Sequence, residues 1–161
     1  MKNIQRHRYK DKKIFETRTL TFDPYPYSQI DLVIGLIQDN LTSDLLKGRK
    51  SLMYRGDVLT NKYYGHCYHS SQALHYLMDT DKLVSMSGED YRGEKHWWLQ
   101  DGQKIYDCTA HQYIDKGEHP PYNIGKKTNW YGWKQRPQQI SLELMKRVLG
   151  SRLNSDSVTV A

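Results

Sequence analysis

The sequence predicts one α+β domain in which a cysteine-bearing helix packs on a small antiparallel sheet, with a further helix towards each end of the chain. Apolar residues recur at helical spacing within residues 28–41, 66–79 and 138–150. Between the last two, the dipeptide Asp101-Gly102 separates two apolar and aromatic runs, a pattern typical of a β-hairpin. With 161 residues, the chain is long enough for one domain with a sizeable core and too short for two ordinary ones.

The N-terminal part predicts a strand followed by a helix. Residues 14–22 alternate as a strand does, and the segment DPYPY then ends regular structure because each proline restricts the residue before it. We expect the helix over residues 28–41 to have Ser28 as its N-cap. A short helical turn is expected over residues 43–48.

The central helix is expected over residues 66–79, with Cys67 in its first turn. We expect Cys67 to lie on the face that packs inward, because helical spacing aligns it with Ser70, Ser71, Leu74 and Met78. The two serines are small, so another element is expected to approach the helix closely there.

The C-terminal half predicts a strand over residues 82–88, the hairpin over residues 95–108 and a final helix. This helix follows Pro137 and is expected to end at Gly150. Residues 151–161 are polar, and we expect them to form a frayed tail.

The hairpin is expected to bring a histidine and an aspartate together. If Asp101-Gly102 forms a two-residue turn, counting outward puts His96 directly opposite Asp107. Opposed side chains have Cβ atoms about 4.5 to 5.5 Å apart, which is within reach of a carboxylate that orients an imidazole. Trp98 lies beside this pair on the same face, where it would exclude water.

Cys67, His96 and Asp107 are the residue types that thiol catalysis needs. A thiolate at a helix N-terminus is favoured by the unpaired N–H groups and the helix dipole, and a nearby imidazolium favours it further. Asp107 would hold the tautomer of His96 and stabilise its charged form. We therefore expect Cys67 as nucleophile, His96 as general base and acid, and Asp107 as the orienting group.

Several other residues are candidates for binding the substrate or its oxyanion. The backbone N–H of Cys67 would be one oxyanion donor, and a side chain from the segment TNKYY would be the second. The candidates are Asn61, Tyr63, Tyr64, Trp98 and His111. His111 belongs to the segment AHQY, which we expect to close over the site. The segment PPYNIGKKTNWYGW is expected to be a loop packed by its own side chains that lines a substrate groove.

The motifs GHCYHSSQALHYLM, HWWLQDGQKIYDCTAHQY and PPYNIG together resemble the papain-like cysteine hydrolase superfamily, which includes cell-wall endopeptidases and transglutaminase-like enzymes. More narrowly they are similar to small uncharacterised proteins of phages and bacteria. The resemblance covers roughly residues 60–150, within a papain-like domain expected over residues 14–150. It implies catalytic roles for Cys67, His96 and Asp107, and it implies no particular substrate.

These patterns lead to a functional expectation. We expect a cysteine-dependent hydrolase or acyl transferase that acts on an amide, peptide or isopeptide bond of a peptide or protein, without a metal or another cofactor. Peptidase, deamidase, amidase and transferase reactions all stay open at this point.

A zinc-binding protein is one alternative, because HCYH and CTAH supply His66, Cys67, His69, Cys108 and His111. Two features count against it. In a helix, Cys67 and His69 point about 200° apart, and the spacing lacks the paired pattern of structural zinc sites. Cys108 follows Asp107 on the hairpin, so we expect its side chain to face away from the site and to form no disulfide with Cys67.

A non-enzymatic binding module on the same fold is the other alternative. The net charge is +6, and seven of the Lys and Arg residues lie within the first 18 positions. The basic N-terminal arm, residues 1–13, could therefore hold the phosphates of a nucleic acid or a protein partner.

The composition also bears on location. The N-terminal segment lacks the apolar stretch of a secretory signal, and no apolar run approaches the about 20 residues that span a bilayer. With only two cysteines, the sequence favours a reducing compartment. We expect a cytoplasmic protein, in the host cytoplasm if a phage encodes it, with no membrane partner.

Overall fold

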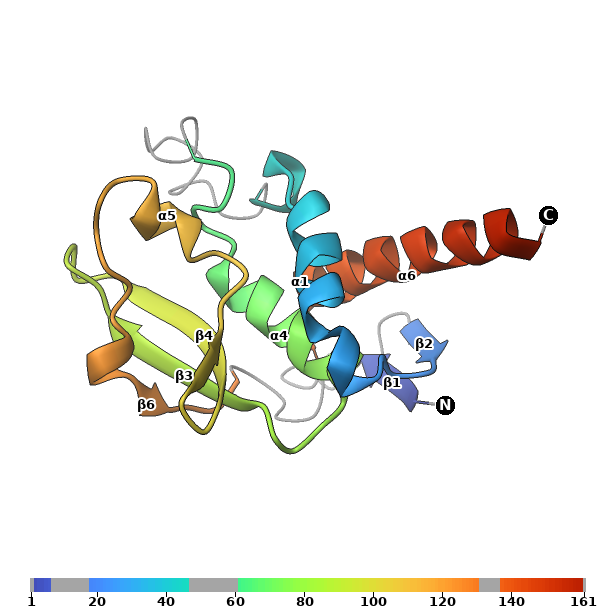
Figure 1. Ribbon diagram of the computed structural model, residues 1–161, viewed down its shortest axis with the longest axis horizontal. Coiled ribbons are helices and arrows are strands. Elements are labelled where there is room, and N and C mark those ends of the chain that lie inside the picture. Colours follow the sequence, from blue (N-terminus) through green and yellow to red (C-terminus); the bar gives the residue numbers. More distant parts are fainter. Residues whose placement is uncertain (1, 7–17, 47–60, 131–136, 161) are drawn as a thin grey trace, which may run out of the picture.

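The computed structural model describes residues 2–6, 18–46, 61–130 and 137–160. In this part of the chain, four helices and one four-stranded antiparallel sheet form an α+β fold, as the sequence predicts (Figure 1). The elements are β1 (Lys2–Arg6), β2 (Arg18–Phe22), η1 (Tyr27–Gln29), α1 (Ile30–Asp39), η2 (Ser43–Leu46), α4 (Cys67–Met78), β3 (Val84–Glu89), β4 (Lys95–Asp101), β5 (Lys104–Tyr106), α5 (His111–Ile114), η3 (Tyr122–Ile124), β6 (Lys126–Lys127) and α6 (Gln139–Val160).

The helix α4 lies at the centre of the molecule, with the sheet on one side and α1 and α6 on the other (Figure 1). It ends at Asp79, which adopts the left-handed conformation with a φ of 46°. Ser70 and Ser71 are buried, as predicted, and Ser71 Oγ donates a hydrogen bond to the carbonyl of Trp97 at 3.1 Å. The small serines therefore let α4 approach β4 closely.

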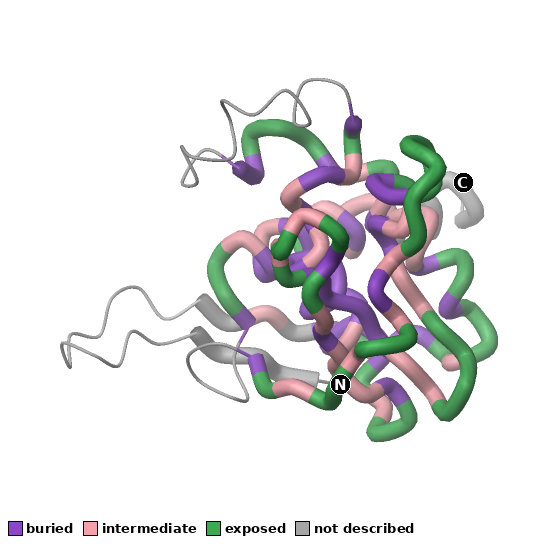
Figure 2. The backbone as a smooth tube through the Cα atoms, turned by 90° about the vertical axis from the view of Figure 1, so that its left-hand side faces the viewer, coloured by how far each residue is buried: buried purple, intermediate pink, exposed green. Residues whose placement is uncertain are grey.

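The core fills the space around α4, and buried residues run through the middle of the chain trace (Figure 2). Its fully buried aliphatic residues include Val33, Ile37, Leu74, Leu77, Leu99, Leu142 and Val148. Burial of each such side chain stabilises the fold by about 1.5 to 3 kcal/mol. A rigid support of this kind fixes the start of α4 relative to β4.

The four-stranded sheet has the order β5-β4-β3-β6, and each neighbouring pair is antiparallel. The predicted register of the β4–β5 hairpin is wrong. The turn residues are Gly102 and Gln103, and Gln100 pairs with Ile105 rather than with Gln103. Gly102 has a φ of 58°, and two-residue hairpins favour glycine at the first central position. Asp101 therefore becomes the last paired residue of β4.

This register displaces Asp107 along the second strand without changing its face. Asp107 lies just after β5, so it is not the direct cross-strand partner of His96 that we predicted. Each residue of β4 pairs two positions further along β5 than expected. Because side chains alternate with a period of two, this displacement leaves Asp107 and His96 on the same face.

The outer helices differ from the prediction at their ends. Ser28 lies inside η1, so α1 begins after Gln29, which makes no side-chain cap. The helix α6 continues past Gly150 to Val160, so the predicted end at Gly150 is wrong, and the segment expected to fray is helical to that point. One glycine costs a helix only about 1 kcal/mol, which is too little to end it. Gly48, the predicted end of the short turn, lies outside the described residues.

The start of the chain pairs with the strand that follows. Lys2 pairs with Phe22 and Arg6 with Arg18, so part of the basic arm forms the strand β1. The predicted strand over residues 14–22 is found as β2, while residues 7–17 lie outside the described part. In Figure 1 this hairpin lies away from the four-stranded sheet, beyond the helices.

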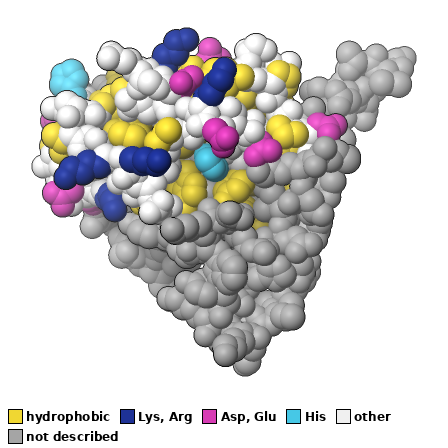
Figure 3. All heavy atoms as spheres, turned by 90° about the horizontal axis from the view of Figure 1, so that it is seen from below, with side chains coloured by type: hydrophobic (Ala, Val, Ile, Leu, Met, Phe, Trp, Pro, Cys, Tyr) yellow, Lys and Arg dark blue, Asp and Glu magenta, His cyan; other side chains and the backbone are white. Residues whose placement is uncertain are grey.

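The charged side chains of the face in Figure 3 include both signs, with Lys and Arg lying among Asp and Glu. Apolar side chains are exposed between them on the same face. In the part of the chain that is described, no helix is both long enough and apolar enough to cross a bilayer.

Candidate active site

Cys67 is the first residue of α4, at the place where the sequence predicts the nucleophile. Its backbone N–H belongs to the first turn, where N–H groups have no partner within the helix. The half-buried thiol lies 3.9 Å from the carbonyl oxygen of Lys95, at the start of β4. The thiol therefore sits where the helix start meets the strand that bears His96.

His96 lies on β4, and its imidazole contacts side chains of several other residues. Its Nε2 is 2.6 Å from Oδ2 of Asp107, and its other nitrogen, Nδ1, is 3.4 Å from the amide nitrogen of Gln112. The imidazole also forms a hydrogen bond with Cys67. Trp98 stacks on the imidazole with ring centroids 5.7 Å apart, and Tyr113 packs against it edge-on at 4.8 Å. The side chain of His96 is fully buried, so its rotamer and tautomer are set by these neighbours.

Asp107 accepts hydrogen bonds from three residues through both of its oxygens. Oδ2 accepts from His96 and from the hydroxyl of Tyr122 at 2.7 Å. Oδ1 accepts from the backbone N–H of Thr109 at 3.0 Å and from its hydroxyl at 3.3 Å. Burial and the charge of Asp107 raise the pKa of Tyr122, so the phenol stays neutral and can donate. These bonds stabilise a charged carboxylate that is almost completely buried.

The surroundings of His96 favour its charged form. Burial lowers the pKa of His96, but the charge and hydrogen bond of Asp107, together with the hydrogen bond and charge of Cys67, raise it to about 10. The charge and hydrogen bonds around the ring therefore favour the imidazolium form of His96.

No family model, curated protein or solved structure matches this chain. The roles of its residues must therefore be argued from chemistry and geometry. The site combines a helix-start cysteine, a buried histidine and a hydrogen-bonded aspartate from three separate elements.

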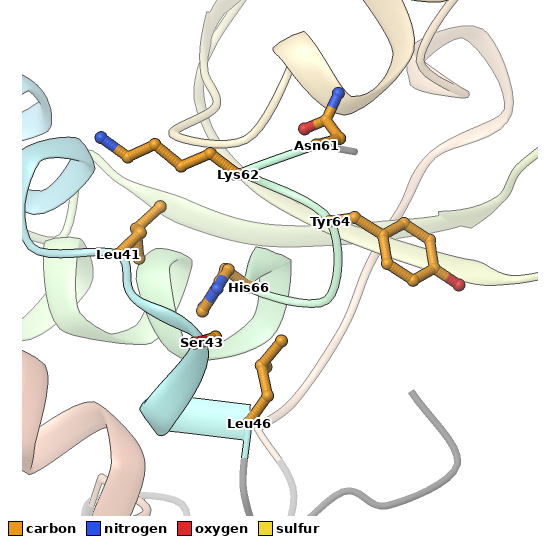
Figure 4. Close-up of a pocket in the computed structure, with 7 residues that line it drawn as sticks. All are labelled: Leu41, Ser43, Leu46, Asn61, Lys62, Tyr64 and His66. Atoms are coloured by element: carbon orange, nitrogen blue, oxygen red, sulfur yellow. The ribbon is translucent and has the colours of Figure 1, made fainter. Parts of the chain in front are cut away.

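Two of the predicted oxyanion candidates are engaged elsewhere. Asn61 points towards α5 (Figure 4), where its Nδ2 donates to the carbonyl of His111 at 3.3 Å and approaches Asp115 at 3.4 Å. The hydroxyl of Tyr64 contacts both carboxylate oxygens of Glu94, at 3.1 and 3.0 Å. Both side chains thus brace the loop before Cys67, and neither donor is aimed at the thiol.

Of the remaining candidates, only Trp98 contacts one of the three predicted catalytic residues in the described structure. Tyr63 stacks on His111, with ring centroids 5.5 Å apart, and so links the loop before Cys67 to α5. Trp98 lies behind His96, as predicted, and its indole N–H donates to Gln100 at 3.1 Å. The segment AHQY does lie over His96, although it forms the short helix α5 instead of a loop.

Sequence reasoning missed the residues that surround the predicted pair. Gln112 and Tyr113 of α5 reach His96, and Thr109 and Tyr122 reach Asp107. The segment PPYNIGKKTNWYGW is predicted to line a groove, but the hydrogen bond that its Tyr122 donates to the aspartate is not predicted. A buried carboxylate needs several hydrogen-bond donors. This requirement is the only signal that indicates further polar residues around Asp107.

A buried aspartate anchors α5 next to the site through an ion pair and a hydrogen bond. Asp90, in the turn between β3 and β4, pairs with Arg92 at 2.8 Å and accepts the hydroxyl hydrogen bond of Tyr113 at 2.9 Å. Its other oxygen accepts the backbone N–H groups of Arg92 and Glu94. Tyr113 therefore links this turn to His96, and α5 is fixed from both sides.

The histidines of the zinc alternative are used differently. His66 Nδ1 and His69 Nε2 lie 2.6 Å apart, and both residues are buried. His66 also lines a cavity of about 130 Å³ behind the start of α4, together with Leu41, Ser43, Leu46, Asn61, Lys62 and Tyr64 (Figure 4). Within the described ranges, no group of three or more His, Cys, Asp or Glu side chains is arranged to hold a metal ion.

Proposed function

We propose that this protein is a cysteine-dependent hydrolase or acyl transferase with a papain-like arrangement, acting on an amide, peptide or isopeptide bond. Cys67 is the nucleophile, and His96 is the general base and acid. Asp107 orients His96 and stabilises its protonated form. The proposal requires no metal or organic cofactor.

One observation above all supports this proposal. A fully buried histidine bridges a half-buried thiol and a buried aspartate, and its pKa is raised to about 10. A histidine with only a structural role needs partners for its N–H groups. It does not need a carboxylate such as Asp107, which already accepts hydrogen bonds from other residues, next to one ring nitrogen. It also does not need the thiol of Cys67, at the start of a helix, next to the imidazole.

The first half of the reaction forms an acyl-enzyme. The Cys67 thiolate attacks the carbonyl carbon, a C–S bond forms, and the C=O π electron pair moves to oxygen. When this pair returns, the C–N bond breaks and the leaving nitrogen takes the proton from Nδ1 of His96. The amine departs, and a thioester at Cys67 remains.

The second half regenerates the thiol. A water molecule, or an amine in a transfer reaction, loses a proton to Nδ1 of His96 as it attacks the thioester carbonyl. The C–S bond then breaks, and the thiolate and imidazolium form again. Which nucleophile enters decides between hydrolysis and acyl transfer.

The same chemistry suits a reducing compartment. Cys67 and Cys108 are both free thiols, and the reaction needs Cys67 reduced. We therefore place the activity in the cytoplasm, with a peptide or protein as substrate.

An activated ester tests the proposal without knowledge of the natural substrate. Wild-type protein is mixed with p-nitrophenyl acetate, the release of p-nitrophenolate is followed in time, and the modified residue is located by peptide mass spectrometry. We expect a rapid burst with the acetyl group on Cys67. If Cys67 is acetylated no faster than a thiol of the unfolded chain, the proposal is wrong.

A further inference from the structure

The amide of Gln112 has a fixed orientation at the site. The hydroxyl of Thr109 donates its single hydrogen to Asp107 at 3.3 Å, so towards Gln112 it can only accept. The atom of Gln112 that lies 3.1 Å from this hydroxyl must therefore be the nitrogen Nε2. One hydrogen of the Gln112 amide is thus used, and the second is directed elsewhere.

The second hydrogen lies next to the reacting atoms. Gln112 Nε2 is 3.4 Å from His96 Nδ1. Because Asp107 occupies Nε2, Nδ1 is the nitrogen that is left for the hydrogen bond of the imidazole with Cys67. When Nδ1 bears a proton it has no lone pair with which to accept from Gln112. In the thiolate–imidazolium pair of the proposed mechanism, this amide N–H therefore has no acceptor on the imidazole.

We infer that Gln112 supplies the side-chain hydrogen bond to the oxyanion formed at Cys67, together with the backbone N–H of Cys67. This inference rests on the proposed function. It replaces the predicted donors Asn61 and Tyr64, whose polar atoms are directed to α5 and Glu94. Donors that are held in place before the reaction stabilise developing charge without reorganisation.

The timing of the proton transfers fits this role. During attack, the proton is on Nδ1 of His96, the C=O π electron pair is on the substrate oxygen, and the free N–H of Gln112 can donate to that oxygen. When the leaving nitrogen takes the proton, the oxygen regains its double bond and Nδ1 recovers its lone pair. Gln112 can then donate to Nδ1 again. The same amide hydrogen of Gln112 therefore bonds to the substrate oxygen when Nδ1 is protonated and to Nδ1 when it is not.

Two probes of Cys67 separate this role from a structural one. Acetylation by p-nitrophenyl acetate passes through an oxyanion, whereas alkylation by iodoacetamide needs only the thiolate. The variant Gln112→Met keeps the length of the side chain and removes the donor, and Gln112→Ala serves as a second variant. Gln38→Met is the matched control, because the Gln38 amide donates to the carbonyl of Cys108 at 3.1 Å and not to the site.

We expect Gln112→Met to slow acetylation of Cys67 roughly a hundredfold to a thousandfold while alkylation keeps the wild-type rate. Gln38→Met should change neither rate. Equal losses of both rates would show that Gln112 only holds His96 in place, and an unchanged acetylation rate would show that it has no role; either result overturns the inference. A wild-type protein that is alkylated but never acetylated would instead overturn the proposed function, and the inference with it.

Discussion

The two cysteines of this protein lie in the same small region and have opposite surroundings. Cys67 is half-buried at the start of α4, with the imidazole of His96 beside it. Cys108 follows Asp107 in the chain, but it is buried in the core. Burial and the charge of Asp107 raise the pKa of the Cys108 thiol, and a hydrogen bond with Ser70 only partly offsets this.

The difference between the two cysteines is electrostatic: Cys108 is buried next to the charge of Asp107, whereas Cys67 contacts the imidazole of His96. The thiol next to the aspartate in the chain is kept neutral by it. The thiol of Cys67 lies on a different element, and His96 stands between it and the aspartate.

The largest effect should come from removing each thiol in turn. Cys67→Ala should abolish acetylation by p-nitrophenyl acetate, because the covalent route is lost. Cys108→Ala should keep the wild-type rate and lower the free energy of unfolding by about 1 to 3 kcal/mol, because it leaves a small cavity. Burst kinetics and urea unfolding measure the two effects, and a full burst in Cys67→Ala would contradict the comparison.

Asp107→Asn should have the next largest effect. The amide can still accept a hydrogen bond from His96, but the charge that supports the imidazolium is lost, so the pKa of His96 should fall. We expect acetylation of Cys67 to slow roughly a hundredfold or more. The matched control is Asp101→Asn on the same hairpin, where the carboxylate accepts a hydrogen bond from Tyr27 at 2.6 Å. Equal rates in the two variants would rule out a role for the Asp107 charge.

His96 should also make the stability of the fold depend on pH. Because its pKa is raised in the folded state, its contribution is fully present below about pH 6.5 and is lost as the pH rises towards about 10. With about 1.4 kcal/mol for each pKa unit, the loss amounts to several kcal/mol. The unfolding free energy of wild type minus that of His96→Gln should shrink over this range, and a difference independent of pH would contradict the charged state.

A smaller effect is expected at the loop that bears Tyr122. Gly125 has a φ of −65°, which suits any residue, but an added Cβ would overlap the ring of Trp98. Gly125→Ala should therefore destabilise the fold by about 1 to 3 kcal/mol. Gly35→Ala in α1 is the control, because a Cβ there meets no atom within 4 Å and should stabilise the helix by about 0.5 to 1 kcal/mol. Thermal unfolding of both variants tests the pair, and equal shifts would contradict the close packing.

The site was predictable where its residues follow local patterns. The helix of Cys67 and the strand of His96 both came from periodicity, and the start of α4 agrees with the prediction to within a residue. The hairpin register was wrong because the glycine occupies the first turn position and not the second. The contact of His96 with Asp107 survived this error, since a displacement by two residues keeps the face of a strand.

The rest of the site depends on contacts between segments that no local pattern connects. Gln112, Tyr113 and Tyr122 reach the pair from a short helix and from a loop, and their positions depend on how these segments fold back over the sheet. The prediction of Asn61 and Tyr64 as oxyanion donors depends only on their position shortly before Cys67 in the sequence. Their contacts with α5 and Glu94 are likewise tertiary, so nearness in sequence to Cys67 does not indicate which way these side chains are directed.

The protonation state of His96 tests the central claim most directly. Nitrogen-15 NMR of the imidazole, assigned with the His96→Gln variant, would follow its titration in wild-type protein. We predict a doubly protonated ring at pH 7 that loses its proton only near about pH 10. A ring that is neutral at pH 7 and titrates near the ordinary pKa of about 6.5 would contradict the charged pair of Cys67 and His96.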